Sequence, residues 1–260
     1  MITAGVDVGA KTIKVVVLDG ETTRARAVAL GGLDTRSALA QAFGEALQAA
    51  GLGRSDLSGV VATGAGRKLV EGADDLVSEV SAAARGATFL FPTARTAIDV
   101  GAEEGRAVRC TEGGKVDDSA VNEKCAAGAG TFAEAMARAL QVDVEELGRM
   151  SLRSTMAVPM NAQCTVFAES EVISLLHAKT PKEDISRAVH DAIASRITSM
   201  VRKVGFQKDV VLIGGMAKNP GFVDAMKRSL ESEVLVPDGP EFIGALGAAL
   251  LAADRVEERA

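Results

Sequence analysis

The sequence contains no Trp and no Tyr, and Phe, present 8 times, supplies all of its 3% aromatic content. A hydrophobic core for 260 residues must therefore be built mainly from Ala, Val, Leu and Ile, and the 47% hydrophobic content is sufficient for one large or two medium domains. Cysteine is also scarce. Three Cys are too few, and an odd number, for a disulfide framework, so free thiols or metal ligation remain.

Clusters of Lys or Arg are absent as well, and the formal net charge is -6. This charge balance argues against nucleic-acid binding. The longest apolar run, 243–253, has about half the length needed to cross a bilayer. The first expected strand begins at Ile2, which argues against a signal peptide. We therefore expect a soluble, cytoplasmic protein that binds neither nucleic acid nor a membrane.

The segment around Asp7 is the first with the composition of a binding site. Asp7 lies near the end of an apolar strand, and Gly9 interrupts the chain before a second strand at 13–18. Glycine lets backbone N–H groups approach an anion closely, and Thr12 and Lys14 add further donors. An acid beside phosphate groups requires a cation between them, which favours Mg²⁺. The alternative is an ordinary hairpin turn of the Asp-x-Gly type.

The same pattern returns about ninety residues later, where Asp99 and Gly101 end another apolar run and open a polar turn at 102–105. Two copies predict two similar halves, each with one hairpin that carries an acid at its tip. We expect domains at 1–95 and 96–245, with a helical insertion at about 141–205 in the second. The last helix, about 246–260, is expected to pack back on the first domain.

The remaining elements follow from periodicity and from helix start and stop signals. Outside the two hairpins we expect strands at 25–30, 57–62, 115–121, 209–213 and 233–236, with 97–100 and 106–110 forming the second hairpin. We expect helices at 37–50 with Ser37 as the N-cap, at 75–91 ended by Pro92, and at 130–140, 144–150, 165–178, 183–204, 219–230 and 241–253.

Two glycine pairs near the end of the chain are further candidates. Gly214 and Gly215 follow a buried strand and precede a helix, so a base or a phosphate could lie against bare backbone there. Gly244 and Gly247 share one helix face, where a simple close crossing with another helix is the alternative. No G-x-x-x-x-G-K-[ST] pattern occurs, which excludes the common P-loop.

These pieces in this order resemble the actin, sugar-kinase and Hsp70 superfamily of ATPases. The resemblance implies an α/β fold of two RNase H-like domains that close on Mg·ATP, with ATP and ADP as ligands. It assigns catalytic roles to Asp7, Asp99 and Glu103. It assigns nucleotide binding to Gly9, Ala10, Lys11, Thr12, Lys14, Gly101, Ala102, Gly214, Gly215, Lys218 and Gly244.

The three cysteines have different surroundings. Cys125 and Cys164 each precede an expected helix, where the helix dipole favours a thiolate and an anionic cluster. Cys110 ends an apolar strand and is interpreted as structural. One iron–sulfur cluster takes four thiolates, so two suitable cysteines per chain imply a cluster shared by two chains. Two ordinary thiols are the alternative.

The cysteine segments 122–132 and 161–172, together with the phosphate loops, resemble the BadF/BadG/BcrA/BcrD ATPase family over nearly the whole chain. The resemblance implies one [4Fe–4S] cluster held by Cys125 and Cys164 of two subunits. It therefore implies a dimer that functions under anaerobic conditions. ATP hydrolysis would drive a low-potential electron into an acyl-CoA enzyme. The implied partners are a second ATPase subunit, identical or paralogous, the acceptor reductase or dehydratase, and reduced ferredoxin or flavodoxin as the donor. The helices at 165–178 and 183–204 would connect the nucleotide state to the geometry of the cluster.

The second phosphate loop departs from the pattern usual in dehydratase activators, Asp-Ile-Gly-Gly-Gln-Asp, because residues 99–104 read Asp-Val-Gly-Ala-Glu-Glu. The change leaves open which residue positions the hydrolytic water. The following Gly-Arg-Ala-x-Arg segment slightly favours a benzoyl-CoA reductase ATPase subunit over an activator of 2-hydroxyacyl-CoA dehydratase. A small-molecule kinase, such as an amino-sugar kinase, and a nucleotide-dependent interaction module without redox chemistry are the alternatives.

Overall fold

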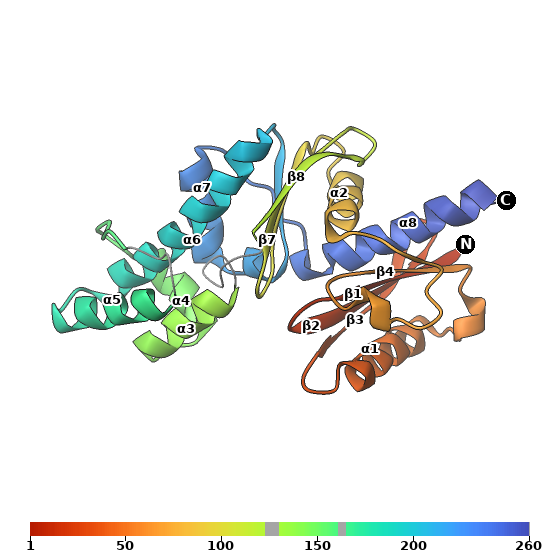
Figure 1. The fold of residues 1–260 in the computed structure, drawn as a ribbon, viewed down its shortest axis with the longest axis horizontal. Coiled ribbons are helices and arrows are strands. Elements are labelled where there is room, and N and C mark those ends of the chain that lie inside the picture. The colour runs from red at the N-terminus through yellow and green to blue at the C-terminus, as the bar shows by residue number, and fades with distance from the viewer. Residues whose placement is uncertain (123–129, 161–164, 260) are drawn as a thin grey trace. The chain divides into compact units, whose positions relative to one another are not determined.

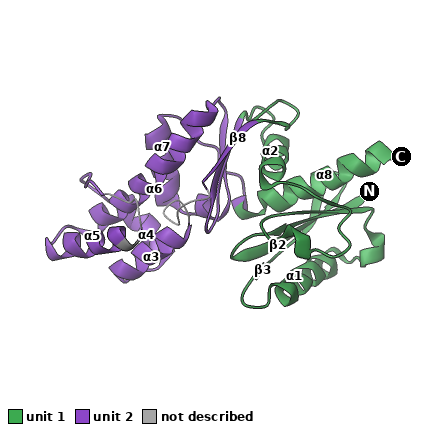
Figure 2. Cartoon of the chain, in the orientation of Figure 1, with its two compact units in different colours: residues 1–95, 110–117, 241–260 green, residues 96–109, 118–240 purple. Residues whose placement is uncertain are grey.

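The computed structural model describes residues 1–122, 130–160 and 165–259. The chain forms two compact units (Figure 2). Unit 1 contains residues 1–95, 110–117 and 241–260, and unit 2 contains residues 96–109 and 118–240. The last helix thus belongs to the same unit as the first strand.

Unit 1 is built on a five-stranded sheet in the order β3-β2-β1-β4-β5 (Figure 1). The strands are β1 (Ile2–Val8), β2 (Thr12–Asp19), β3 (Thr22–Leu30), β4 (Gly59–Thr63) and β5 (Asp75–Leu76), and the helices are α1 (Thr35–Ala50), α2 (Glu79–Leu90) and α8 (Ile243–Arg259). β1 runs antiparallel to β2 and parallel to β4. The strands of the expected first hairpin and the expected strand near 57–62 are confirmed.

The two faces of this sheet are covered by different helices. Ala4, Val6 and Val8 alternate along β1 and pack in one hydrophobic cluster with α1. Gly5 points to the opposite face, where a Cβ atom would lie only 1.9 Å from the carbonyl oxygen of Ala245 in α8. Because neighbouring residues of a strand face opposite sides, this alternation places the sheet between α1 and α8.

Two expectations for unit 1 are wrong at element boundaries. Asp34, rather than Ser37, caps α1, because its Oδ1 accepts a hydrogen bond from the backbone N–H of Ser37 at 3.0 Å. Residues 75–76 are not helical. They form β5, which pairs with β4 and completes the sheet, and α2 begins only after its N-cap, Ser78.

Unit 2 contains a four-stranded sheet in the order β8-β7-β6-β9. Its strands are β6 (Thr96–Val100), β7 (Gly105–Cys110), β8 (Val116–Asn122) and β9 (Val210–Ile213), and its helices are α3 (Gly130–Leu140), α4 (Val144–Ser151), α5 (Thr165–His177), α6 (Lys182–Val204) and α7 (Pro220–Leu230). β6 is antiparallel to β7 and parallel to β9, as β1 is to β2 and β4. The helices α4, α5 and α6 lie between β8 and β9 in the sequence, together with α3.

The helical part of unit 2 buries a continuous aliphatic core. The 3.6-residue periodicity of α6 is confirmed, since its apolar residues Ile185, Val189, Ile193, Ile197, Val201 and Val204 are buried in one cluster. The strand expected at 233–236 is wrong. Leu235 makes only an isolated bridge to Val211, and the chain reaches Pro237, which has no N–H to continue a ladder.

Within the described ranges, every helix is too short or too polar to cross a membrane.

Candidate functional site

Asp7 and Lys14 face each other across the first hairpin. They are cross-strand partners in the antiparallel register of β1 and β2, with Lys14 Nζ 3.4 Å from Asp7 Oδ2. Both side chains are largely buried. The turn between them is closed by a hydrogen bond from the N–H of Gly9 to the carbonyl of Thr12, 3.1 Å, and the loop residues Ala10 and Lys11 are exposed. The turn therefore holds an ion pair at its base and presents backbone at its tip.

A second turn, following β4, lies directly against Asp7. Thr63 is the parallel-register partner of Asp7, and Gly64 follows with a φ of +92°. A Cβ atom on Gly64 would lie 2.7 Å from Asp7 Oδ1, so this position requires glycine for both its backbone conformation and its space. The Thr63 hydroxyl is buried and has no hydrogen-bond partner in the described part of the chain. An orphaned hydroxyl in this position fits a polar ligand or an ordered water.

The start of α8 completes this group in unit 1. A Cβ atom on Gly244 would lie 3.4 Å from Asp7 Oδ2, so bare backbone of the first helical turn faces the carboxylate. Gly247 has a different role, because its Cβ atom would lie 1.9 Å from the carbonyl oxygen of Ala82 in α2. The alternative interpretation, a close helix crossing, applies at Gly247, whereas Gly244 lies beside Asp7.

Unit 2 repeats this arrangement around Asp99. Arg106 is the cross-strand partner of Asp99, with Arg106 Nη1 3.2 Å from Asp99 Oδ2, and its other terminal nitrogen is paired with Glu104. The turn is closed by the N–H of Gly101, which donates to the carbonyl of Glu104 at 2.9 Å. Glu103 is exposed, with no hydrogen bond or ion pair to any other described residue. Its carboxylate is thus open to solvent for a ligand or a water.

Gly214 holds the position relative to Asp99 that Gly64 holds relative to Asp7. It follows β9 with a φ of +86°, and its Cβ atom would lie 2.5 Å from Asp99 Oδ1. Gly215 is exposed, and a Cβ atom there would meet nothing within 4 Å. The backbone after β9 is therefore open, as expected, although the next element is a 3₁₀ turn at Gly215–Lys218 rather than an α-helix. Lys218 is exposed at the end of that turn.

The N-terminus of α3 is bound to the second hairpin. The backbone N–H of Gly130 donates to the carbonyl of Gly101, and that of Thr131 donates to the carbonyl of Ala102, both at 2.9 Å. The Thr131 hydroxyl donates to the same Ala102 carbonyl at 2.9 Å. Three hydrogen bonds thus fix the first turn of α3 to the Asp99 loop.

Cys125 and Cys164, the two expected cluster ligands, lie outside the described residues. The helices that follow them, α3 and α5, pack against each other. Cys110 is buried at the end of β7, and burial raises the pKa of its thiol. Its Sγ lies 3.8 Å from the carbonyl oxygen of Ala94, in agreement with a structural role. Elsewhere among residues 1–122, 130–160 and 165–259, no group of three His, Cys, Asp or Glu is placed to hold a metal ion.

The geometry suits phosphate and a hard cation. Each unit presents a carboxylate, a cation paired with it, and bare glycine backbone, and these groups match the oxygen ligands of Mg²⁺ and the donors that phosphate oxygens require. Sequence reasoning marks the turn at 63–67, which contains Gly64, as suited to phosphate, but it missed Arg106 and Thr131. The signal for Arg106 is present in the sequence, since it follows Asp99 by seven residues, as Lys14 follows Asp7.

Proteins of similar sequence include activators of acyl-CoA dehydratases and a subunit of a benzoyl-CoA reductase. The chain is 41% identical over 262 residues to the 2-hydroxyisocaproyl-CoA dehydratase activator of Clostridioides difficile, with 99% of this chain and 97% of the relative covered. It is 41% identical to the activator of lactoyl-CoA dehydratase of Anaerotignum propionicum, with both chains fully covered. It is 33% identical to a subunit of the benzoyl-CoA reductase of Thauera aromatica, covering 100% of this chain and 95% of that relative.

Solved structures agree with these similarities. Component A of the Acidaminococcus fermentans (R)-2-hydroxyglutaryl-CoA dehydratase superposes with a TM-score of 0.95 at 38% identity, and 99% of each chain is covered. The Clostridium difficile 2-hydroxyisocaproyl-CoA dehydratase activator, solved with bound ADPNP, gives 0.93 at 41% identity and covers 100% of this chain and 97% of that one.

A more distant likeness bears on the fold alone. The ROK hexokinase of Thermus thermophilus gives a TM-score of 0.56 at 20% identity, covering 99% of this chain and 100% of that one. The expected α/β fold of the actin and sugar-kinase type is confirmed. A sequence model of the BadF/BadG/BcrA/BcrD ATPase family matches residues 4–252, and the chain belongs to this family.

Proposed function

We propose that this protein hydrolyses ATP and uses the energy to pass a low-potential electron to a partner enzyme that acts on an acyl-CoA. The observation that carries the proposal is that two equivalent hairpins each pair an aspartate with a cation, Asp7 with Lys14 and Asp99 with Arg106. The chain that contains them is similar over its full length to dehydratase activators. The identity of 41% to two activators, against 33% to the benzoyl-CoA reductase component, favours the activator type. This preference reverses the slight one drawn from the Gly-Arg-Ala-x-Arg segment.

In this proposal Asp7 and Asp99 would supply the carboxylates that hold Mg²⁺. Mg²⁺ neutralises charge on the phosphate oxygens when it is bound. Lys14 and Arg106, now paired with these carboxylates, would donate charge-assisted hydrogen bonds of the same kind to phosphate oxygens. The backbone of Gly9–Thr12 and of Gly101–Ala102 adds N–H donors, and Glu103 is the candidate for positioning the hydrolytic water. Gly214, Gly215, Lys218 and Gly244 contribute the remaining nucleotide contacts.

We assign the sulfur ligands of a [4Fe–4S] cluster to Cys125 and Cys164 of two chains. When bound, the cluster supplies a carrier for one electron. Support comes from the helices that follow the two cysteines. Cys164 directly precedes α5, α5 packs against α3, and the start of α3 is hydrogen-bonded to the Asp99 loop. Through these contacts, a change in the Asp99 loop on nucleotide binding would be transmitted to α3 and α5, which follow the cysteine segments.

The partners that complete this scheme are a second copy or a paralogue of this chain, the acceptor dehydratase or reductase, and reduced ferredoxin or flavodoxin as the electron donor. Coupling requires that ATP and ADP favour different arrangements of the protein.

The test is iron and sulfide analysis of anaerobically purified protein, with a visible spectrum recorded with and without ADP. We expect four irons per two chains. Cys164→Ser should remove the iron and leave ADP binding unchanged, whereas Cys110→Ser, the matched control in a buried strand, should keep both. Iron-free wild-type protein would contradict the redox function. If such protein phosphorylated an amino sugar, it would be a kinase of the same superfamily.

A further inference from the structure

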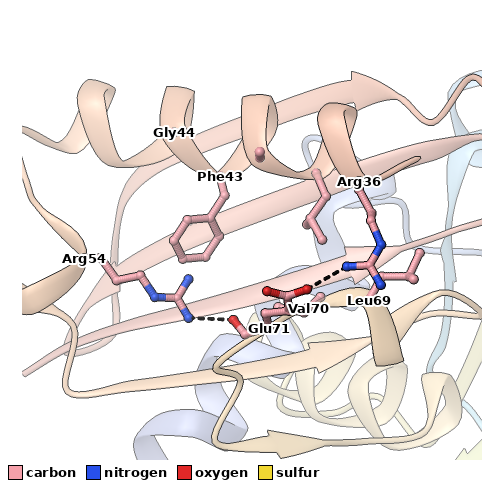
Figure 3. Close-up of a pocket in the computed structure, with 9 residues that line it drawn as sticks. Arg36, Phe43, Gly44, Arg54, Leu69, Val70 and Glu71 are labelled. Carbon is pink, nitrogen blue, oxygen red and sulfur yellow. Dashed lines mark hydrogen bonds and ion pairs between the residues drawn. The ribbon is translucent and has the colours of Figure 1, made fainter. Parts of the chain in front are cut away.

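Unit 1 contains a cavity of about 420 Å³ beneath α1, on the sheet face opposite α8 (Figure 3). One wall is α1, and the other is the segment that follows the turn at Gly64. The lining residues are Arg36, Leu39, Ala40, Phe43, Gly44, Arg54, Leu69, Val70 and Glu71. A volume of this size is within the range of small-molecule sites.

The cavity exists because the positions of α1 that face it include two small residues, Ala40 and Gly44. Ala40 and Gly44 lie one helical turn apart and leave the helix surface uncovered. A Cβ atom on Gly44 would meet no atom within 4 Å. The side chains of Leu39, Phe43 and Val70 are almost fully buried and form an apolar floor.

Two guanidinium groups lie at the edge of this floor (Figure 3). Arg54 is stacked over the Phe43 ring, 4.8 Å from its centre, and donates to the backbone carbonyls of Glu71 and Gly72 at 3.0 and 2.9 Å. In the described part of the chain Arg54 is paired with no carboxylate, so its positive charge is not neutralised by an acid. Arg36 Nη1 lies 2.6 Å from Glu71 Oε1, and both side chains are exposed. The lining thus carries two positive charges and one negative charge.

We propose that this cavity binds a small amphipathic monocarboxylate, with its aliphatic or aromatic body on the apolar floor and its carboxylate at the guanidinium groups. The net positive charge of the lining complements one carboxylate. Arg36, at the edge of the apolar floor, already binds one carboxylate, that of Glu71. Glu71 would therefore compete with the ligand for Arg36.

The far wall of the cavity continues into the turn beside Asp7. The N–H of Leu69 donates to the carbonyl of Gly66, and the N–H of Gly66 donates to the carbonyl of Val8, both at 2.9 Å. Occupation of the cavity should therefore alter nucleotide affinity through this segment. This second step rests on the proposed function, whereas the binding step does not.

The binding test uses 3-phenylpropanoate and its uncharged counterpart 3-phenyl-1-propanol, each titrated against the full chain by calorimetry and ligand-observed NMR. Loss of the charged hydrogen bond should weaken binding of the alcohol at least tenfold. Gly44→Leu should fill the cavity and abolish binding without loss of thermal stability, because leucine is the better helix former. Ala49→Leu, at an exposed position of the same helix outside the cavity, should bind as wild type does. Glu71→Gln should tighten binding severalfold, and Glu45→Gln, also exposed on α1, should not.

Absence of binding, equal binding of the alcohol, or undiminished binding to Gly44→Leu would overturn the site. The second step is measured as the Kd for ADP with and without saturating 3-phenylpropanoate, and a change of threefold or more is expected in wild type but not in Gly44→Leu. Carboxylate binding with an unchanged Kd would overturn the coupling alone. Failure to bind ADP at all would contradict the proposed function and leave the cavity assignment intact.

Discussion

Arg106 occupies in the second hairpin the position that Lys14 occupies in the first. Each lies directly opposite the aspartate of its own hairpin, seven residues further along the chain, with a nitrogen atom near Oδ2 of that aspartate. The other carboxylate oxygen of each aspartate lies against a glycine of positive φ, Gly64 or Gly214, that follows the adjacent parallel strand. The two units therefore share the placement of a cation, an acid and a glycine as well as their strand order.

Replacing Arg106 with Gln should weaken nucleotide binding. A charge-assisted hydrogen bond contributes about 1.5–3 kcal/mol, so the Kd for ADP should rise about 10- to 100-fold. The control is Arg24→Gln, which removes an exposed arginine that is also paired with an aspartate, Asp19. Unchanged ADP affinity in Arg106→Gln would mean that the arginine serves only to neutralise Asp99.

Asp7→Ala should abolish ATP hydrolysis and leave the iron content of anaerobically purified protein intact. Removal of the carboxylate takes away the proposed Mg²⁺ partner, but Asp7 belongs to unit 1, whereas the helices that follow the two cysteines in sequence, α3 and α5, belong to unit 2. Phosphate release and iron content are measured on the same preparation. Simultaneous loss of both would identify Asp7 as a structural residue.

Gly214→Ala should destabilise the protein by about 1–3 kcal/mol, because alanine is strained at a φ of +86° and its Cβ atom would be forced against Asp99 and Val100. Gly215→Ala is the matched control one residue away. Its Cβ atom meets open space, so its effect on stability should be small. Urea unfolding of both variants measures the difference, and equal midpoints would contradict the placement of Gly214.

His190 predicts a pH dependence of stability. Its side chain is buried in α6, its Nδ1 lies 2.7 Å from the carbonyl oxygen of Ser186, and desolvation lowers the pKa of the imidazole to about 4. The unfolded chain binds the proton at an ordinary pKa near 6.5, so the folded protein loses stability as pH falls below that value and continues to lose it down to about 4.

Between pH 7.5 and 5.5, protonation of His190 in the unfolded chain should lower the free energy of unfolding by about 1 kcal/mol. Urea unfolding at the two pH values measures it, and His190→Gln should flatten the difference. His177, the other histidine of the sequence, is exposed, so His177→Gln should retain the wild-type dependence. An identical pH dependence in all three proteins would mean that His190 becomes protonated in the fold.

The sequence was sufficient to predict both hairpins, because Asp7 and Asp99 end apolar strands and stand before glycine turns. It also predicted the long periodic helix α6. It could not rank Asp34 above Ser37 as a cap, because both are good capping residues and only the position of the first helical turn decides between them. The two-residue strand β5 has no periodicity of its own and exists because Val61 and Ala62 offer a ladder.

The interactions that sequence reasoning missed in the candidate site depend on register. Strand pairing places Arg106 opposite Asp99. Asp7 and Val8 lie so close to position 64 that only glycine fits there. The bond from Thr131 to Ala102 joins two segments 29 residues apart. Each of these relationships is created by tertiary structure rather than by a local pattern.

The position of α8 has a consequence for synthesis on the ribosome. The sheet of unit 1 is made from residues that precede position 77, yet the helix that covers its face at Gly5 follows the whole of unit 2 in the sequence. Until α8 has been synthesised, the part of this face around Gly5 lacks the helix that covers it in the folded protein and is open to chaperones or to wrong partners. The sheet of unit 1 is thus completed as a domain only after the residues of unit 2 have been synthesised.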